Sequence, residues 1–298
     1  MSTPKTEPSF TGRSGPALLV RAALPAIPGI NALPGIKKTG VAYEELSLTR
    51  EPVALERTAV DAYAELCGFP IKDTVPLPYP HMLAFPLHMA LMSSPDFPSP
   101  AMGMVHIENS ISGYRPISVG EAVAVTATVG QPEPHPVGKA YRFLTVATVE
   151  GEVVWESTST YLVRGKRNAD VTWLGPTPGR DLIEVDPSGP VFPLKADLGR
   201  RYAKVAGDYN PIHLYPLTAK ALGFRRQIAH GMWTKARCIA ALENRLPGAV
   251  RVDVAFKKPV FLPSSVAFGS LKHLDGYDFS LHKRGSDTLH LVGRTTAL

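Results

Sequence analysis

The chain has 298 residues, of which 44% are hydrophobic, and a formal net charge of +6. This length fits two domains of about 150 residues each, and no apolar run is as long as the about 18 residues that a membrane-spanning helix needs. The charge alone could indicate nucleic acid, but there is no basic run with interleaved aromatic residues and no nucleic-acid motif, so we expect no nucleic-acid partner and no membrane span.

The first half opens with an apolar stretch at residues 16–36, which we expect to pack as an arm on the fold because Arg21 and recurring prolines break the layout of a signal peptide. The only cysteines, Cys67 and Cys238, lie in apolar segments. They indicate neither a disulfide framework nor a metal site, and they fit a reducing cytoplasm.

Segment 81–93 has helical character, and runs that alternate small and β-branched residues follow it. We expect these runs to be antiparallel strands, at residues 122–128, 141–150 and 153–163. Proline and glycine then concentrate between Arg164 and Pro193, which predicts a linker.

The second half repeats this order. Apolar residues recur at three- and four-residue spacing in 231–244, which predicts a helix. Alternating runs with turn signals between them predict the strands 251–256, 266–274, 277–283 and 289–296. A helix followed by antiparallel strands, present twice, predicts an α+β fold in which each sheet wraps its own long helix, an arrangement that resembles the hot-dog fold.

Short matches between the halves support a duplication. They occur in the same order: 63–68 with 202–207, Pro80-His81-Met82 with Ala229-His230-Gly231, and Arg115-Pro116-Ile117 with Lys258-Pro259-Val260. We therefore expect an intrachain pseudo-dimer, with a degenerate N-terminal domain and its arm at 1–165, a linker at 166–193 and a catalytic C-terminal domain at 194–298.

An acid and an imidazole lie five residues apart in the segment 207–213, at Asp208 and His213. Between them Asn210 can cap, and Pro211 can open, a helix expected from Ile212 to about Leu222. A carboxylate and a histidine held at such a corner suit the addition of water to a conjugated double bond, which needs a base for the water and an acid for the α-carbon. The same residues could instead be turn and cap residues beside a buried histidine.

Hydration of a thioester-conjugated bond also needs stabilisation of the enolate oxygen. The backbone N–H of Gly231, at the start of the second helix, is the natural candidate, because glycine lets the backbone approach a ligand closely. We expect the neighbouring His230 to fix the loop.

The whole string resembles the motif of MaoC-like dehydratases and (R)-specific enoyl-CoA hydratases (hydratase 2). The resemblance rests on Tyr202, Gly207-Asp208-x-Asn210-Pro211-Ile212-His213, Ala219, Gly223-Phe224 and Ile228-Ala229-His230-Gly231-Met232. It implies a dyad of Asp208 and His213 acting on a water, an oxyanion hole at Gly231 and a supporting Asn210. The reaction implied is reversible hydration of trans-2-enoyl thioesters to (R)-3-hydroxyacyl thioesters in fatty-acid metabolism, without a cofactor. One departure is Tyr215-Pro216, where many members carry Asp or Asn two residues after the histidine.

Eight basic residues surround the lone acid Asp208 between Gly199 and Arg237. They are Arg200, Arg201, Lys204, Lys220, Arg225, Arg226, Lys235 and Arg237. Such a field suits the phosphates of coenzyme A or of an acyl-carrier protein, although an ordinary solvated basic face is an equal alternative. We expect Arg225, Arg226, Asn210, His230 and Met232 to bind the substrate.

The first half has 13 residues from Gly68 to His81, where the second has 23 from Gly207 to His230. The missing residues correspond to the turn and helix that hold the dyad, so we expect the N-terminal half to be catalytically silent. An apolar trough for the acyl chain could remain there, with four residues as its candidate lining, and ordinary core packing is the alternative for each. The four are Met82, Phe85, Met89 and Met92.

Two other functions fit the same fold: an acyl-CoA thioesterase, and a non-catalytic acyl-CoA or acyl-carrier binding protein. The sequence leaves open whether the carrier is coenzyme A or a protein. It also leaves open whether the chain is a monomer or a homodimer.

Overall fold

The computed structural model describes residues 45–101, 103–173 and 182–298. The arm expected at residues 16–36 and the proline-rich run 175–180 lie outside these ranges. Within them, the strands form one sheet in the order β1-β3-β5-β6-β2-β8-β11-β10-β9-β7, with β4 paired to β5.

The described part of the N-terminal half contributes six strands. They are β1 (Leu46–Ala54), β2 (Val105–Gly113), β3 (Ala122–Val129), β4 (Glu133–His135), β5 (Gly138–Val149) and β6 (Glu152–Arg164). The C-terminal half contributes five: β7 (Val191–Leu194), β8 (Val250–Phe256), β9 (Ser264–His273), β10 (Gly276–Lys283) and β11 (Leu289–Ala297). The seven strands that alternation predicts are all confirmed, while β1, β2, β4 and β7 were not predicted.

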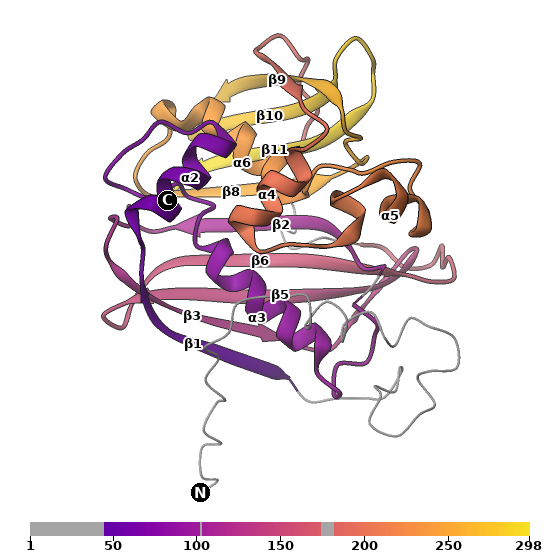
Figure 1. Ribbon diagram of the computed structural model, residues 1–298, viewed down its shortest axis with the longest axis horizontal. Coiled ribbons are helices and arrows are strands. Elements are labelled where there is room, and N and C mark those ends of the chain that lie inside the picture. Colours follow the sequence, from indigo (N-terminus) through magenta and orange to yellow (C-terminus); the bar gives the residue numbers. More distant parts are fainter. Residues whose placement is uncertain (1–44, 102, 174–181) are drawn as a thin grey trace, which may run out of the picture.

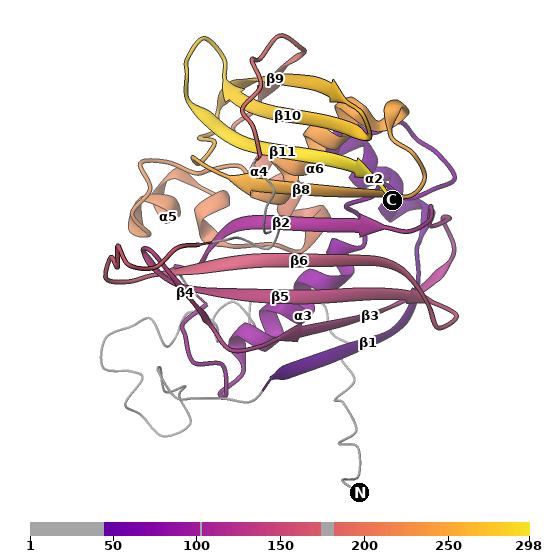
Figure 2. The ribbon, with the colours of Figure 1, turned by 180° about the vertical axis from the view of Figure 1, so that it is seen from behind.

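The helices lie on one face of this sheet, and the other face is open to view from behind (Figures 1 and 2). The α-helices are α2 (Arg57–Cys67), α3 (His81–Ser93), α4 (Leu198–Ala206), α5 (Pro216–Ala221) and α6 (Gly231–Leu242). The described residues also form two 3₁₀ helices, η3 (Pro211–His213) and η4 (Glu243–Arg245). No helix among the described residues is both long and apolar enough to span a membrane.

The two halves have the same strand order. The run β1-β3-β5-β6-β2 matches β7-β9-β10-β11-β8, and each run ends on the strand that follows a long helix, α3 or α6. Strands β2 and β8 pair antiparallel, with Glu108 opposite Ala255 and Gly113 opposite Val250. The two expected sheets are thus joined into one, because each edge satisfies the backbone groups of the other. The α+β double hot-dog architecture is confirmed.

Alternation along the strands places the core beneath the helices. In β3, Val123, Val125, Ala127 and Val129 are fully buried, as a strand with one covered face requires. Strand β7 begins at Val191, within the residues that the sequence assigns to the linker, and pairs with β9. The division of the chain into domains at 165 and 194 stays a prediction.

Candidate active site

The loop after α4 carries Asp208 and is held by its own side chains. Gly207 ends the helix in a left-handed conformation, with φ 75°, which favours glycine. Asp208 Oδ1 then accepts a hydrogen bond from the N–H of Asn210 at 3.0 Å, and Asn210 Oδ1 accepts one from the N–H of Ile212 at 3.3 Å. Asn210 therefore caps the next helix, as predicted, and the turn fixes Asp208.

The expectation of a single helix from Ile212 to Leu222 is wrong. The chain forms the short 3₁₀ helix η3, and α5 starts separately at Pro216. Tyr215 between them is extended, with φ −140° and ψ 154°, because a residue before proline is driven out of the helical region. The unusual Tyr215-Pro216 pair thus separates the two helices and leaves His213 at the end of η3.

His213 is nearly buried, with 7% of its surface exposed, and its orientation is fixed. Its Nδ1–H donates to the carbonyl of Ile228 at 2.8 Å, which leaves Nε2 available as a proton acceptor. Its ring stacks on that of His230, with centroids 3.7 Å apart. One ligating atom from each of Asp208, His213 and His230 lies within 4.8 Å of the others, so the structure brings the predicted dyad together.

His230 ties the loop to α6. Its Nε2–H donates to the backbone carbonyl of Asp208 at 3.0 Å and lies 3.7 Å from Asp208 Oδ2. This contact has the loop-fixing character expected from the sequence. Gly231 follows as the first residue of α6, where helical N–H groups have no partner within the helix. The ring of Phe256 lies directly against Gly231, 3.2 Å from where a Cβ would stand.

The electrostatics of the site suit proton transfer. Burial raises the pKa of Asp208, and the His213 charge and the Asn210 N–H partly oppose this. Burial lowers the pKa of His213, opposed by Asp208 and the Ile228 carbonyl. The two pKa values therefore move toward each other. Burial also lowers the pKa of His230 far below its ordinary value, so its ring is neutral.

The same three residues are close enough to be considered as metal ligands, yet their arrangement suits a metal ion poorly. The planes of His213 and His230 are only 26° from parallel, so their in-plane lone pairs do not converge on one point. His213 Nδ1 and His230 Nε2 already donate to carbonyl groups. The geometry fits acid–base chemistry better than metal binding.

The structure places the other predicted substrate-binding residues in different environments, one in the core and two near the surface. Met232 is 6% exposed and belongs to the hydrophobic core, so it supports α6 from within. Arg225 and Arg226 lie at the end of the loop before Gln227, with their guanidinium groups 4.1 and 5.9 Å from the ring of Phe261. Arg225 is exposed and free to meet an anion.

One member of the predicted basic cluster, Lys235, does not lie at the surface and so cannot contact a carrier phosphate there. Lys235 is fully buried on α6 and donates to Asn109 and Val252. The position of Lys235 on α6 directs its side chain toward the sheet. The prediction of a basic cluster counted charges along the sequence and assumed that every lysine is exposed. Arg237 is also drawn inward, 3.9 Å from the ring of Phe192.

Three residues near the dyad were missed by the sequence analysis. Tyr161, from β6 of the N-terminal half, is buried, and the negative charge of Asp208 contributes to raising its pKa after burial itself. Phe256 covers Gly231. Gly199 lets α4 touch the backbone of His213, since a Cβ there would overlap the His213 carbonyl. The glycine and the phenylalanine lie in segments that the sequence analysis used only for charge or strand pattern.

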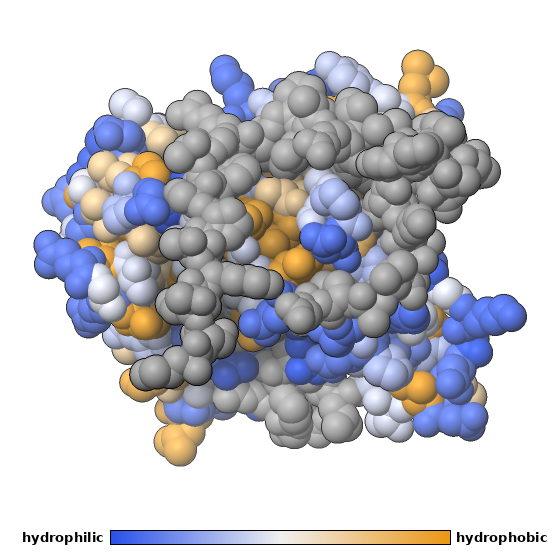
Figure 3. Space-filling view, turned by 90° about the horizontal axis from the view of Figure 1, so that it is seen from below, coloured by the Kyte–Doolittle hydropathy of each residue, from blue (hydrophilic) through white to orange (hydrophobic). Residues whose placement is uncertain are grey.

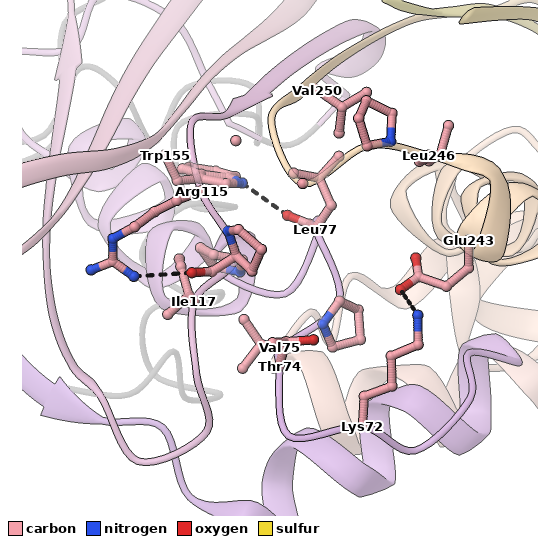
Figure 4. Close-up of a pocket in the computed structure, with 16 residues that line it drawn as sticks. Lys72, Thr74, Val75, Leu77, Arg115, Ile117, Trp155, Glu243, Leu246 and Val250 are labelled. Carbon is pink, nitrogen blue, oxygen red and sulfur yellow. Dashed lines mark hydrogen bonds and ion pairs between the residues drawn. The ribbon is translucent and has the colours of Figure 1, made fainter. Parts of the chain in front are cut away.

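A cavity of about 170 Å³ lies before α3 and at the end of β2, and residues from both halves of the chain line it (Figure 4). Trp155 Nε1 donates to the carbonyl of Leu77 in its wall, at 2.8 Å. Its lining contains neither aspartate nor histidine, and its one acid, Glu243, pairs with Lys72 at 3.0 Å. This lining therefore holds no counterpart of Asp208 or His213, and the catalytic silence of the N-terminal half stays a prediction.

Comparisons with known proteins agree with this geometry. A family model described as MaoC like domain matches residues 183–276. The chain is 35% identical over 289 residues to 3-hydroxyacyl-thioester dehydratase X of Mycobacterium tuberculosis, covering 97% of this chain and 100% of that protein. It is 35% identical over 69 residues to the (R)-specific enoyl-CoA hydratase of Aeromonas caviae, covering 22% of this chain and 52% of that protein. The crystal structure of HtdX from Mycobacterium tuberculosis is similar with a TM-score of 0.74 at 35% identity, covering 85% of this chain and 100% of that one.

Proposed function

The chain belongs to the family of MaoC-like dehydratases, and on this basis we propose that it is a hydro-lyase that interconverts trans-2-enoyl thioesters and (R)-3-hydroxyacyl thioesters in fatty-acid metabolism. The observation that carries the proposal is the meeting of Asp208 and His213 beside the first turn of α6. Names of relatives also favour hydration and dehydration over the thioesterase alternative.

The proposed mechanism uses the site atoms that can still accept a hydrogen bond. Nε2 of the neutral His213 accepts a proton from a water that the Asp208 carboxylate holds by its second hydrogen. The oxygen of that water bonds to the β-carbon of the enoyl thioester, and the electron pair of the double bond moves onto the thioester carbonyl. His213 then returns the proton to the α-carbon on the same face, which restores the carbonyl. Dehydration runs these steps in reverse.

The enolate oxygen needs a donor that is already in place. The N–H of Gly231 supplies it at the start of α6, where the helix dipole also favours negative charge. His230 keeps Asp208 in position through its bond to the backbone, and Asn210 does so by holding the turn. Both are positioning residues in this proposal.

We assign the carrier's phosphates to Arg225 and Arg226, because these cations follow the dyad loop and precede α6. Either coenzyme A or an acyl-carrier protein presents such a phosphate. Comparing kcat/KM for the two forms of one acyl group, in the chain and in an Arg225→Ala variant, distinguishes the carriers. A cytoplasmic location stays a prediction. Whether the protein is a monomer or a homodimer also stays open, and light scattering measures it.

The direct test is hydration of crotonyl-CoA, followed by loss of enoyl absorbance and chiral analysis of the product. Asp208→Asn and His213→Ala should each lower kcat/KM by about 1,000-fold or more. The partly exposed His273 and the exposed Asp275, hydrogen-bonded at 2.8 Å, offer matched controls: Asp275→Asn and His273→Ala should leave kcat/KM unchanged. Release of free thiol, or an (S) product, would contradict the proposal.

A further inference from the structure

A cluster of three histidines lies in the N-terminal half, apart from the dyad. His81 and His88 come from α3 and His106 from β2. The ring centroid of His81 lies 5.6 Å from that of His88 and 6.4 Å from that of His106. Burial lowers the pKa of all three, that of His81 to about 3, so the rings are neutral. A neutral imidazole offers one hydrogen-bond donor and one acceptor.

Two of these histidines have a buried nitrogen without a partner. His88 is satisfied by Thr145 Oγ1 at 2.8 Å and Tyr161 Oη at 3.5 Å. In contrast, Nδ1 of His81 and Nε2 of His106 are buried and make no hydrogen bond within the described part of the chain. His81 is only 2% exposed. A buried unpaired polar atom costs about 1–3 kcal/mol, so a side chain kept only for packing would be apolar.

The cluster connects directly to the oxyanion site. The ring of Phe256 lies against Gly231, and its centroid is 5.1 Å from that of His106. His106 in turn stacks on Tyr161, with centroids 4.5 Å apart, and the charge of Asp208 reaches Tyr161. A chain that leaves the thioester carbonyl at Gly231 and passes Phe256 therefore meets His106 next.

The structure supports only part of the expected lining of the apolar trough. Met89 and Met92 are 8% and 3% exposed and belong to the core, so they are not part of an open wall. Met82 and Phe85 are only partly buried. Seen from below, the molecule shows hydrophobic surface near the middle of this face (Figure 3). On α3 itself, the ring centroids of His81 and Phe85 lie 6.2 Å apart, so apolar groups and imidazoles are neighbours on this helix.

We propose that His81 and His106 form a binding site for an oxygen substituent, a hydroxyl or keto group, on the acyl chain beyond the reacting double bond. The unpaired nitrogens then gain a partner when the substrate binds, and a plain alkyl chain leaves them unpaired. This inference rests on the proposed function. It makes the enzyme selective for oxygenated acyl chains over saturated ones of the same length.

The test compares trans-2-decenoyl-CoA with analogues that carry one hydroxyl or keto group at successive carbons beyond the double bond. The wild-type enzyme should prefer one position by about 5- to 10-fold in kcat/KM, the worth of one or two hydrogen bonds. His106→Phe keeps the ring stacking but removes the nitrogens, and His81→Leu removes the second imidazole. Each variant should bring the ratio of kcat/KM for the preferred oxygenated substrate to that for trans-2-decenoyl-CoA close to one. His106→Gln, which still donates and accepts hydrogen bonds, should retain part of this preference.

A buried histidine elsewhere supplies the matched control. His282 on β10 is 3% exposed and bonds the backbone of Val185, so His282→Phe should leave the ratio unchanged. Melting temperatures should stay equal or rise in His106→Phe and His81→Leu, because each removes an unpaired buried atom. Absence of a preference at every position, or an equal loss in all variants, overturns the inference. Failure to hydrate crotonyl-CoA, which ends one carbon past the double bond, instead overturns the proposed function and this inference with it.

Discussion

The protonation states of Asp208 and His213 determine the pH dependence. Burial raises the pKa of Asp208 above 3.8 and lowers that of His213 below 6.5. Since the carboxylate must be ionised and the imidazole neutral, protonation of either one removes an acceptor. We expect kcat/KM for crotonyl-CoA to fall as the pH decreases, with a midpoint set by whichever of the two groups has the higher pKa.

The groups that face the dyad are His230 and Tyr202 from the C-terminal half and Tyr161 from β6. Their pKa values lie outside the relevant range, because burial lowers that of His230 and raises those of the tyrosines. In Asp208→Asn the loss of the negative charge should shift the acid limb of any residual activity to lower pH. An acid limb at the same pH in the wild type and in Asp208→Asn would show that a group outside the dyad controls the rate.

The proposed oxyanion site requires that no side chain is present at Gly231. A Cβ there would stand 3.2–3.4 Å from three atoms of the Phe256 ring, which is tighter than ordinary contact. In Gly231→Ala the N–H persists but its position or that of the ring must shift, so kcat/KM should fall about 10- to 100-fold with little change in stability. Gly231→Ala combined with Phe256→Leu should recover part of this loss relative to Phe256→Leu alone. Wild-type rates in Gly231→Ala would remove this amide from the mechanism.

At the scale of elements, α4 holds the dyad loop through Gly199. A Cβ at this buried position would overlap the carbonyl oxygen of His213. Gly199→Ala should therefore displace η3, with a cost of about 1–3 kcal/mol in unfolding free energy, and lower kcat far more than KM. Lys204→Ala, at an exposed position of the same helix, is the control. Full activity in a destabilised Gly199→Ala would show that the contact only supports the fold.

The elements that the sequence predicted are those whose pattern is local. Strands such as β3 and β10 alternate clearly, and the dyad spans a single turn between Asp208 and His213. Strand β2 was missed because its residues include polar ones, among them the buried Asn109, whose partners come from β6 and α6. Tyr161 reaches the dyad only through the packing of the two halves, which no spacing along the chain reveals.

At the scale of the whole molecule, both halves contribute residues to the candidate active site. Asp208, His213 and Gly231 come from the second half, while Tyr161 and His106 reach the same region from the first. The junction between the halves is the pairing of β2 with β8. The arrangement of the candidate site therefore depends on the stability of the pairing between β2 and β8.

Lys235 fastens that junction. From α6 its Nζ donates to Asn109 Oδ1 at 2.6 Å and Asn109 O at 3.1 Å on β2, and to Val252 O at 2.9 Å on β8. It is fully buried, so Lys235→Met leaves acceptors unpaired and should cost about 2–4 kcal/mol in urea unfolding. Asn109→Leu should be equally harmful, because it leaves the ammonium without its shortest bond. The double variant should cost clearly less than the sum of the two, since both partners are then gone. The exposed Lys272→Met is the control, and additive costs in the double variant would show that this bond does not couple the halves.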